Sequence, residues 1–403
     1  MKKHKILLQV LGLLLCLSLL SGCVNPGGAA EVDNADSVVD GAIEIDEIVI
    51  GILAPMTGPV ARFGVAVHEG AMLYIDQYNA RGGLQIRPIL FDEEGNPTNA
   101  ITGYHWLVDQ GITALIGSVT SGPTMAVVPE AYADNMPMIT ATSTHANVTV
   151  NADTGAVWSN VFRSCFIDPF QGVKMAEFAS EILGAQTAAV LFSNDIDYSI
   201  GLMEAFIWRA GEIGLEIIAV ETFVADAVDF LGQLTNIAAA DPDVLFIPAY
   251  VESVALIGSQ SIAAGLDTVL LGADGWDGTL DIMADPSVLN GSFHMTGFTV
   301  EDETPIVQNF IADFYAAYGH QPDMFSAQAY DAAMILIAAI ELALADGHMP
   351  NTDEFKASVI AHMSATDINA VTGRITFDRY NNPQKTAVIV YFQDGVARLW
   401  GTF

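Results

Sequence analysis

Basic residues are scarce in this sequence, which has 14 Lys and Arg against 48 Asp and Glu and a net charge of −34. A protein that binds nucleic acid neutralises phosphates with clusters of Lys and Arg, so this balance excludes nucleic acid as a partner. It also argues against adsorption to anionic lipid surfaces. A strongly acidic surface favours solubility instead, and its self-repulsion falls at high salt.

Cysteine is rarer still, with three residues in the chain. Cys16 and Cys23 both lie near the N-terminus, so Cys165 is alone in the remainder and an intramolecular disulfide is excluded there. We interpret Cys165 as a small buried hydrophobic residue rather than a nucleophile. The eight histidines show no spacing typical of metal ligands, so we expect neither a metal nor another cofactor.

The N-terminus has the pattern of an export signal. Three lysines precede an apolar run from Ile6 to Leu20, which is short for a bilayer-spanning helix and suits a cleavable segment. The run ends in Ser-Gly-Cys23, which resembles the bacterial lipoprotein cleavage site. The resemblance implies a signal peptide over residues 1–22 and a lipid on Cys23. We therefore expect attachment to the outer face of the cell membrane, or to its periplasmic side in a two-membrane cell.

The chain after Cys23 lacks a second run apolar enough to span a membrane. Ala329–Ala345 comes nearest, but Asp331 and Glu341 interrupt it, so we expect a buried helix there. Residues 23–46 are rich in small and acidic residues and predict a flexible tether between the lipid anchor and the folded body. The lipid is thus the expected membrane attachment.

Short β-branched runs alternate with segments of helical periodicity from residue 48 to residue 271, which predicts an α/β fold with parallel sheets flanked by helices. The expected strands are 48–53, 84–91, 114–117, 137–140, 188–192, 216–221, 244–247 and 269–271. The expected helices are 64–80, 99–110, 121–135, 170–183, 201–213, 230–239 and 253–264.

An irregular stretch from Ala141 to Ile167 divides this alternation into two similar halves. It argues against a single barrel of eight βα units, as does the helix-rich segment 305–362. Two final strands, 373–377 and 387–392, are expected to pair as an antiparallel hairpin.

Hydroxyl groups gather in two loops that follow expected strands. Gly117–Thr124 contains four Ser or Thr residues at the start of a helix, and Thr140–Thr144 contains four more. Free backbone N–H groups at a helix N-terminus favour an anion such as a carboxylate, and one hydroxyl alone would suffice for capping. The loops therefore predict a polar ligand site at the carboxyl ends of the strands.

Five stretches resemble the leucine/isoleucine/valine-binding family of type I periplasmic binding proteins, in the family's order and spacing from about residue 47 to 400. They are Ile50–Pro59, Tyr74–Gly83, Ala114–Ser121, Pro137–Thr144 and Asp241–Ile247. The resemblance implies two lobes, each a parallel sheet flanked by helices, joined by a hinge of three crossings. We expect lobe 1 to contain residues 47–164 and 296–371, and lobe 2 to contain residues 165–295 and 372–403.

The same resemblance implies a site between the lobes for a bound amino acid. Ser121 occupies the position that contacts the ligand carboxylate in this family. The Thr142 carbonyl and the Thr144 hydroxyl occupy the positions that contact the ligand ammonium. Asp274 stands where relatives often have Glu, and this shorter acid leaves the identity of the ligand open. The remaining expected contacts are aromatic: Phe63, Tyr198, Tyr250 and Trp276.

Two charged residues near these positions receive other interpretations. Asp168 is expected to cap the helix that begins near Phe170. Arg62 is expected to be a solvated side chain near the rim of the site.

Taken together, the sequence predicts a monomeric solute-binding protein that closes two lobes on an amino acid and delivers it to the permease subunits of an ABC transporter. We find no nucleophile elbow, no Cys–His pairing and no phosphate loop, so an enzyme is not expected. The alternatives are a protein that binds an amide, urea or aromatic acid, and a sensory protein of the same fold.

Overall fold

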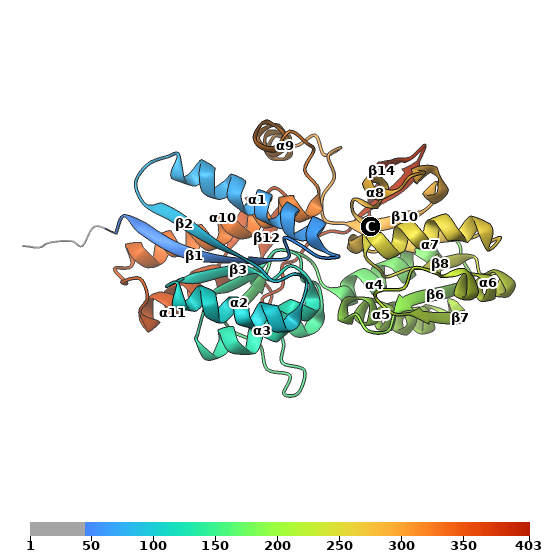
Figure 1. Cartoon of the computed structure of the whole chain (residues 1–403), viewed down its shortest axis with the longest axis horizontal. Helices are drawn as coiled ribbons and strands as arrows, with labels where there is room; N and C mark the ends of the chain where they lie inside the picture. Colours follow the sequence, from blue (N-terminus) through green and yellow to red (C-terminus); the bar gives the residue numbers. More distant parts are fainter. Residues whose placement is uncertain (1–44) are drawn as a thin grey trace, which may run out of the picture. The chain divides into compact units, whose positions relative to one another are not determined.

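The computed structural model describes residues 45–403. The predicted signal peptide, the proposed lipid-bearing Cys23 and all but the end of the predicted tether lie outside this range. The described part is an α/β fold with two large sheets, each belonging to one lobe, and a separate two-stranded sheet (Figure 1). We call these lobes 1 and 2, in chain order of their first strands.

The sheet of lobe 1 has five parallel strands in the order β2-β1-β3-β4-β5. Their bounds are β1 Glu47–Ala54, β2 Gln85–Asp92, β3 Ala114–Gly117, β4 Met138–Thr140 and β5 Val161–Arg163. All but β5 were predicted from the sequence. That strand is three residues long and lies inside the irregular stretch, where it leaves no readable pattern.

The helices of lobe 1 cover both faces of this sheet (Figure 1). Along β1, Ile50 and Ile52 belong to the core cluster that contains residues of α1 and α10, whereas Leu53 belongs to the cluster of α2 and α3. Side chains alternate between the faces of a strand, so a strand buried on both sides is apolar throughout. The helices are α1 Ala61–Asn79, α2 Pro97–Asp109, α3 Ser121–Ala133, α9 Pro305–Tyr318, α10 Met324–Ala345 and α11 Asp353–Ser364.

Lobe 2 has a seven-stranded sheet in the order β14-β13-β10-β9-β8-β6-β7. Strands β7, β6, β8, β9 and β10 are parallel to one another. β13 runs antiparallel to β10, and β14 runs antiparallel to β13. Their bounds are β6 Thr187–Ser193, β7 Glu216–Phe223, β8 Val244–Phe246, β9 Val269–Gly272, β10 Phe293–Thr296, β13 Val388–Gln393 and β14 Val396–Thr402.

Helices again pack against both faces of the second sheet. Ala188 and Val190 of β6 pack with α4 and α5, and Ala189 and Leu191 pack with α6 and α7. The helices are α4 Asp168–Glu177, α5 Asp197–Ile213, α6 Leu231–Ala240, α7 Val251–Ala263 and α8 Thr279–Ile282. The predicted helix 170–183 is thus α4 continued by a π-helical turn, Phe178–Ile182.

The expected hairpin of strands 373–377 and 387–392 is wrong. β12 (Gly373–Thr376) pairs instead with β11 (Asp367–Ala370), while β13 joins the sheet of lobe 2. The segment between them stays with lobe 1, because the Asn381 amide donates to the Val161 carbonyl. Ala387 is the first residue of this segment in a lobe 2 cluster, so the chain enters lobe 2 well after the expected boundary at Thr372.

Among the described residues, α10 is the one helix long and apolar enough to cross a membrane by length and composition. However, 67% of its apolar window is buried inside the fold. This is the buried helix predicted over 329–345, and it begins five residues earlier than expected. Asp323 caps it, accepting a hydrogen bond from the Ser326 N–H at 2.9 Å.

Candidate functional site

Seven of the eight ligand contacts expected from the sequence line one narrow cavity between the lobes. Lobe 1 contributes Phe63, Ser121, Thr142 and Thr144, and lobe 2 contributes Tyr198, Tyr250 and Asp274. Phe63, Ser121 and Tyr198 lie in the first turns of three helices. Asp274 begins a short 3-10 helix and the other three lie in loops, so the folding of both lobes is needed to bring them together.

The lobe 1 wall is rich in hydroxyl groups. Ser121 is the first residue of α3, and its Oγ lies 3.3 Å from the His145 N–H. The Thr142 hydroxyl donates to the Val119 carbonyl at 2.7 Å, which holds the two hydroxyl-rich loops together. The Thr144 hydroxyl is buried and has no partner among the described residues. This wall therefore offers a helix N-terminus and one unused hydroxyl to a ligand.

Aromatic rings form the sides of the cavity. Phe63 stacks on Phe325 with ring centroids 4.4 Å apart and meets Tyr250 edge-on at 5.4 Å. Tyr250 in turn stacks on Tyr198 at 4.8 Å. Because Tyr250 touches rings from both lobes, this aromatic group is a contact between them and an apolar surface for a side chain.

Asp274 is the acid of the lobe 2 wall and is held from two sides. Its Oδ1 accepts a hydrogen bond from the Tyr198 hydroxyl at 2.8 Å, and its backbone N–H donates to the Gln171 side chain at 2.9 Å. Burial raises the pKa of Asp274 to about 6, although the hydrogen bonds limit the rise. A cation next to Asp274 would remove part of the cost of burying its charge.

The contact between Tyr198 and the backbone after Asp274 requires glycine at position 275, because a side chain would clash there. Its N–H donates to the Tyr198 hydroxyl at 2.8 Å. A Cβ at this position would lie 2.6 Å from the same hydroxyl oxygen and 2.9 Å from the Ala249 carbonyl. The close approach of backbone and tyrosine thus fixes the hydroxyl that holds Asp274.

Asp168 is a second buried acid close to the cavity, and its expected role as a helix cap is wrong. It is the first residue of α4 and makes no capping hydrogen bond. Both carboxylate oxygens are buried without a hydrogen-bond partner among the described residues. Burial first, and the charge of Asp274 second, raise the pKa of Asp168 well above its usual range. The Thr144 hydroxyl lies near enough to oppose this shift but outside hydrogen-bond geometry.

Trp276 does not line this cavity, contrary to expectation. Its ring is fully buried in lobe 2, where its Nε1 donates to the Ile247 carbonyl at 2.8 Å and its faces lie near His294 and Phe392. Arg62 is partly buried and pairs with Asp281 at 2.5 Å, so it is not merely a solvated side chain.

Sequence reasoning missed four other lining residues, which are Val119, Thr120, Gly275 and Phe325. The first two lie inside the hydroxyl-rich loop that was singled out, and Gly275 follows Asp274. Phe325 belongs to α10, some 260 residues after Phe63, and its contact depends on tertiary structure alone. The unpartnered carboxylate of Asp168 also left no signal in the sequence.

The space between these walls is small, at about 10 Å³, which is room for roughly one water molecule. A larger cavity of about 820 Å³ lies elsewhere between the lobes, and no residue lines both. The donors and acceptors for an amino acid are in the small cavity, so chemistry rather than size makes it the candidate site.

Cys165 is free and buried, as predicted, and burial raises the pKa of its thiol to about 12. It therefore stays protonated and unreactive at neutral pH. Within residues 45–403 no group of three or more His, Cys, Asp or Glu side chains is placed to hold a metal ion.

Known proteins match this chain along most of its length. A family model described as "Periplasmic binding protein" matches residues 47–395. The Leu/Ile/Val-binding protein homolog 3 of Brucella melitensis is 25% identical over 334 residues, which cover 82% of this chain and 87% of the homolog.

Solved structures of similar fold include proteins with different ligands. A branched-chain amino acid transporter substrate-binding protein of Streptococcus pneumoniae, in complex with isoleucine, has a TM-score of 0.79 and 28% identity over 88% of this chain and 98% of that one. A solute-binding protein of an ABC transporter from R. palustris, in complex with benzoate, has a TM-score of 0.80 and 23% identity over 88% and 96%. The second likeness concerns the fold alone.

Proposed function

Because this chain belongs to the leucine/isoleucine/valine-binding family of type I periplasmic binding proteins, we propose that it captures an amino acid between its lobes and delivers it to the permease of an ABC importer. An amino acid with a branched or otherwise apolar side chain suits the aromatic walls made by Phe63, Tyr198 and Tyr250.

The main support for this proposal is that the two walls of the cavity favour opposite charges. The lobe 1 wall favours an anion, and the acids on the lobe 2 side favour a cation. Ser121 and the N-terminus of α3 offer donors to a carboxylate, whereas Asp274 and Asp168 supply buried carboxylates with no cation within ion-pair distance among the described residues. A zwitterion satisfies both ends, since its carboxylate meets the helix and its ammonium meets the acids. An aromatic acid would leave both carboxylates uncompensated, which is costly for buried charges.

Closure of the lobes is the proposed mechanism. The narrow space between the walls means that a ligand enters when the lobes separate and the aromatic rings move apart. Contacts from the second lobe then stabilise the closed form, and the ligand shifts the equilibrium by as much as those added contacts are worth. The closed pair of lobes is the surface that the permease would recognise.

The test is a titration of the purified protein with leucine, isoleucine, valine, an aliphatic amide, urea and benzoate, followed by calorimetry. We expect binding of at least one amino acid and a raised melting temperature, since the ligand binds the native state alone. We expect Asp274→Asn to weaken that binding by roughly 30- to 150-fold, or about 2–3 kcal/mol. The proposal would be contradicted if amides or benzoate bound and none of the amino acids did.

We also propose that the exported protein is held to the membrane by a lipid on Cys23, a residue outside the described range. The Ser-Gly-Cys23 pattern supports this assignment. Expression of the wild-type protein should place it in the membrane fraction, and Cys23→Ala should move it to the soluble exported fraction. Membrane association that persists in Cys23→Ala would overturn the anchor without affecting ligand capture.

A further inference from the structure

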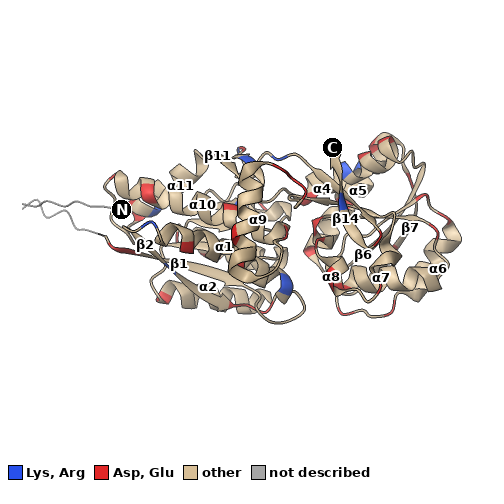
Figure 2. Ribbon diagram, turned by 90° about the horizontal axis from the view of Figure 1, so that it is seen from above, with Lys and Arg blue, Asp and Glu red and all other residues tan. Residues whose placement is uncertain are grey.

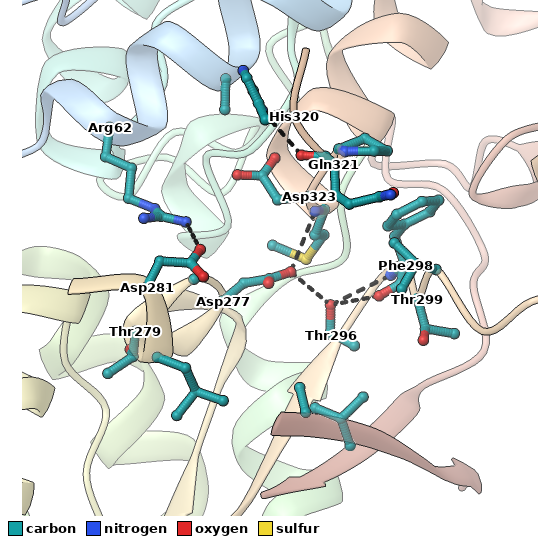
Figure 3. Close-up of a pocket in the computed structure, with 18 of the residues that line it drawn as sticks. Arg62, Asp277, Thr279, Asp281, Thr296, Phe298, Thr299, His320, Gln321 and Asp323 are labelled. Carbon is teal, nitrogen blue, oxygen red and sulfur yellow. Dashed lines mark hydrogen bonds and ion pairs between the residues drawn. The ribbon is translucent and has the colours of Figure 1, made fainter. Parts of the chain in front are cut away.

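The larger cavity between the lobes lies beside α1 and has a lining of its own (Figure 3). Arg62 and Glu69 of α1 and Asp323, just before α10, come from lobe 1. Asp277 and the short helix α8 come from lobe 2. The volume of about 820 Å³ is ample for a small organic molecule.

The carboxylates of two partly buried acids, Asp277 and Asp323, line this cavity. Asp277 Oδ2 accepts hydrogen bonds from the Thr296 hydroxyl at 3.1 Å and from the Met324 N–H at 3.3 Å, and Asp323 accepts from the α10 backbone. Neither has a Lys, Arg or His within ion-pair distance among residues 45–403. The guanidinium of Arg62 is already paired with Asp281 (Figure 3). Burial raises the pKa of both Asp277 and Asp323, and repulsion by Asp323 adds to the rise at Asp277. The Arg62 guanidinium opposes both shifts in part.

His294 adds a buried acceptor to the same lining. The residue is 3% exposed, and its Nδ1 lies 3.2 Å from the Met295 carbonyl. Burial lowers the pKa of His294 to about 4, so the ring is neutral and Nδ1 carries the proton donated to that carbonyl. Nε2 is then an acceptor, and it has no hydrogen-bond partner in the described part of the chain. Thr279, also fully buried and lining the cavity, has an unpartnered hydroxyl.

We propose that this cavity binds a small organic cation, an amine with an apolar body. Its ammonium would satisfy Asp277, Asp323 and His294, all of which are acceptors. Its body would lie on the apolar remainder of the lining, which includes Val65, Phe298, Phe314, Val390 and Phe392. Nothing in the amino-acid site is needed for this binding.

Occupancy would couple to the amino-acid site because the cavity is lined from both lobes. An amine that contacts Asp277 of lobe 2 and Asp323 of lobe 1 stabilises the arrangement in which the lobes are close, and the amino acid stabilises the same arrangement. Each ligand therefore strengthens the other. This coupling rests on the proposed amino-acid function, whereas the amine binding does not.

The test uses phenethylamine as the probe and 2-phenylethanol as its neutral counterpart, titrated into the full chain by calorimetry. We expect phenethylamine to bind and the alcohol to bind at least tenfold more weakly. Asp277→Asn should weaken the amine about tenfold or more, and Asp323→Asn should do likewise while keeping a good N-cap for α10. Glu204→Gln removes an exposed acid on α5 and should change nothing.

Asp274→Asn separates the two sites. It should leave phenethylamine binding unchanged, whereas an amine that used the amino-acid site would lose affinity. Equal binding of the alcohol, or full amine affinity in both Asp277→Asn and Asp323→Asn, would overturn the proposal.

The coupling between the two sites has its own test. Leucine affinity that stays constant at saturating phenethylamine would overturn it. If no amino acid binds but the amine still depends on Asp277, the accessory site stands and the amino-acid function fails.

Discussion

Acidic side chains line both cavities between the lobes. The buried Asp274 and Asp168 lie beside one cavity, and the partly buried Asp277 and Asp323 lie in another, all without an ion-pair partner among the described residues. Asp331 shows the other solution, since the charge of the buried Lys385 offsets part of its burial and its carboxylate accepts from the N–H groups of Val371 and Thr372. A carboxylate withdrawn from water without an opposite charge beside it is destabilising until a cation arrives, which makes these acids candidates for ligand contacts.

Asp274 predicts opposite effects of pH on stability and on binding. Its pKa is about 6 in the folded protein and 3.8 in the ordinary case, so the folded state holds the proton more tightly. As pH falls through 6, the ligand-free protein gains stability from this group, whereas amino-acid affinity falls because the carboxylate is neutralised. Melting temperatures from pH 7 to pH 4 should therefore rise for wild type relative to Asp274→Asn. A constant difference between the two would contradict the assignment.

Asp168→Asn should improve stability and weaken binding at once. Replacing an unpartnered buried acid by a neutral isostere should stabilise the ligand-free protein by about 1 kcal/mol, or roughly 1–3 °C in Tm. Loss of the second negative group should weaken leucine about tenfold. Thermal melts and calorimetry measure the two effects, and a variant that loses both stability and affinity would point to a structural role instead.

At the scale of elements, the ends of helices and strands carry the function. α3 starts at Ser121, after the short loop 118–120 that follows β3, and β4 leads into the loop of Thr142 and Thr144. Parallel strands end at the same edge of a sheet, so the two loops meet there, and the Thr142 hydroxyl joins them through the Val119 carbonyl. This edge faces the Asp274 turn of lobe 2 across the cavity.

The N-terminus of α3 should discriminate a carboxylate from an amide. Leucinamide should bind wild type at least tenfold more weakly than leucine, because a charged acceptor gains more from the helix N–H groups and from Ser121. Ser121→Ala should narrow that ratio while leaving the fold intact, as measured by calorimetry and circular dichroism. A ratio that is unchanged in Ser121→Ala would remove Ser121 from the carboxylate contact.

At the scale of the whole molecule, the charge is distributed over both lobes. Asp and Glu recur along both lobes in Figure 2, whereas Lys and Arg are few. With 14 basic residues, most of the 48 acidic ones have no opposite charge to pair with. The resulting self-repulsion opposes compact folding, and salt screens it.

Salt should therefore stabilise this protein. Raising NaCl from 0.05 to 1 M should increase Tm by several degrees, since the Debye length falls to about 3 Å at 1 M. Tetramethylammonium chloride at the same ionic strength should give a similar rise, because screening does not depend on the identity of the cation. A melting temperature that neither salt changes would show that repulsion between the acidic groups lowers the stability of the fold very little.

The sequence by itself determined the α/β class, nearly every strand of lobe 1, the helix boundaries within a few residues, and most of the residues around the candidate site. These depend on local periodicity and on loops next to their own strands, which a linear pattern records. It did not reveal β5, β10, β11, β14 or the partners of β12 and β13, because short strands and long-range pairing leave little local signal.

Tertiary structure alone decided which acids lack partners. The sequence predicted Asp168 as a helix cap and Trp276 as a wall of the cavity. In the fold, Asp168 lies beside the candidate site without capping, and Trp276 is buried within lobe 2. The cavity of Asp277, Asp323 and His294 joins residues from both lobes that are far apart in sequence. Burial and missing countercharges arise from packing between distant segments, so they exist only once the chain has folded.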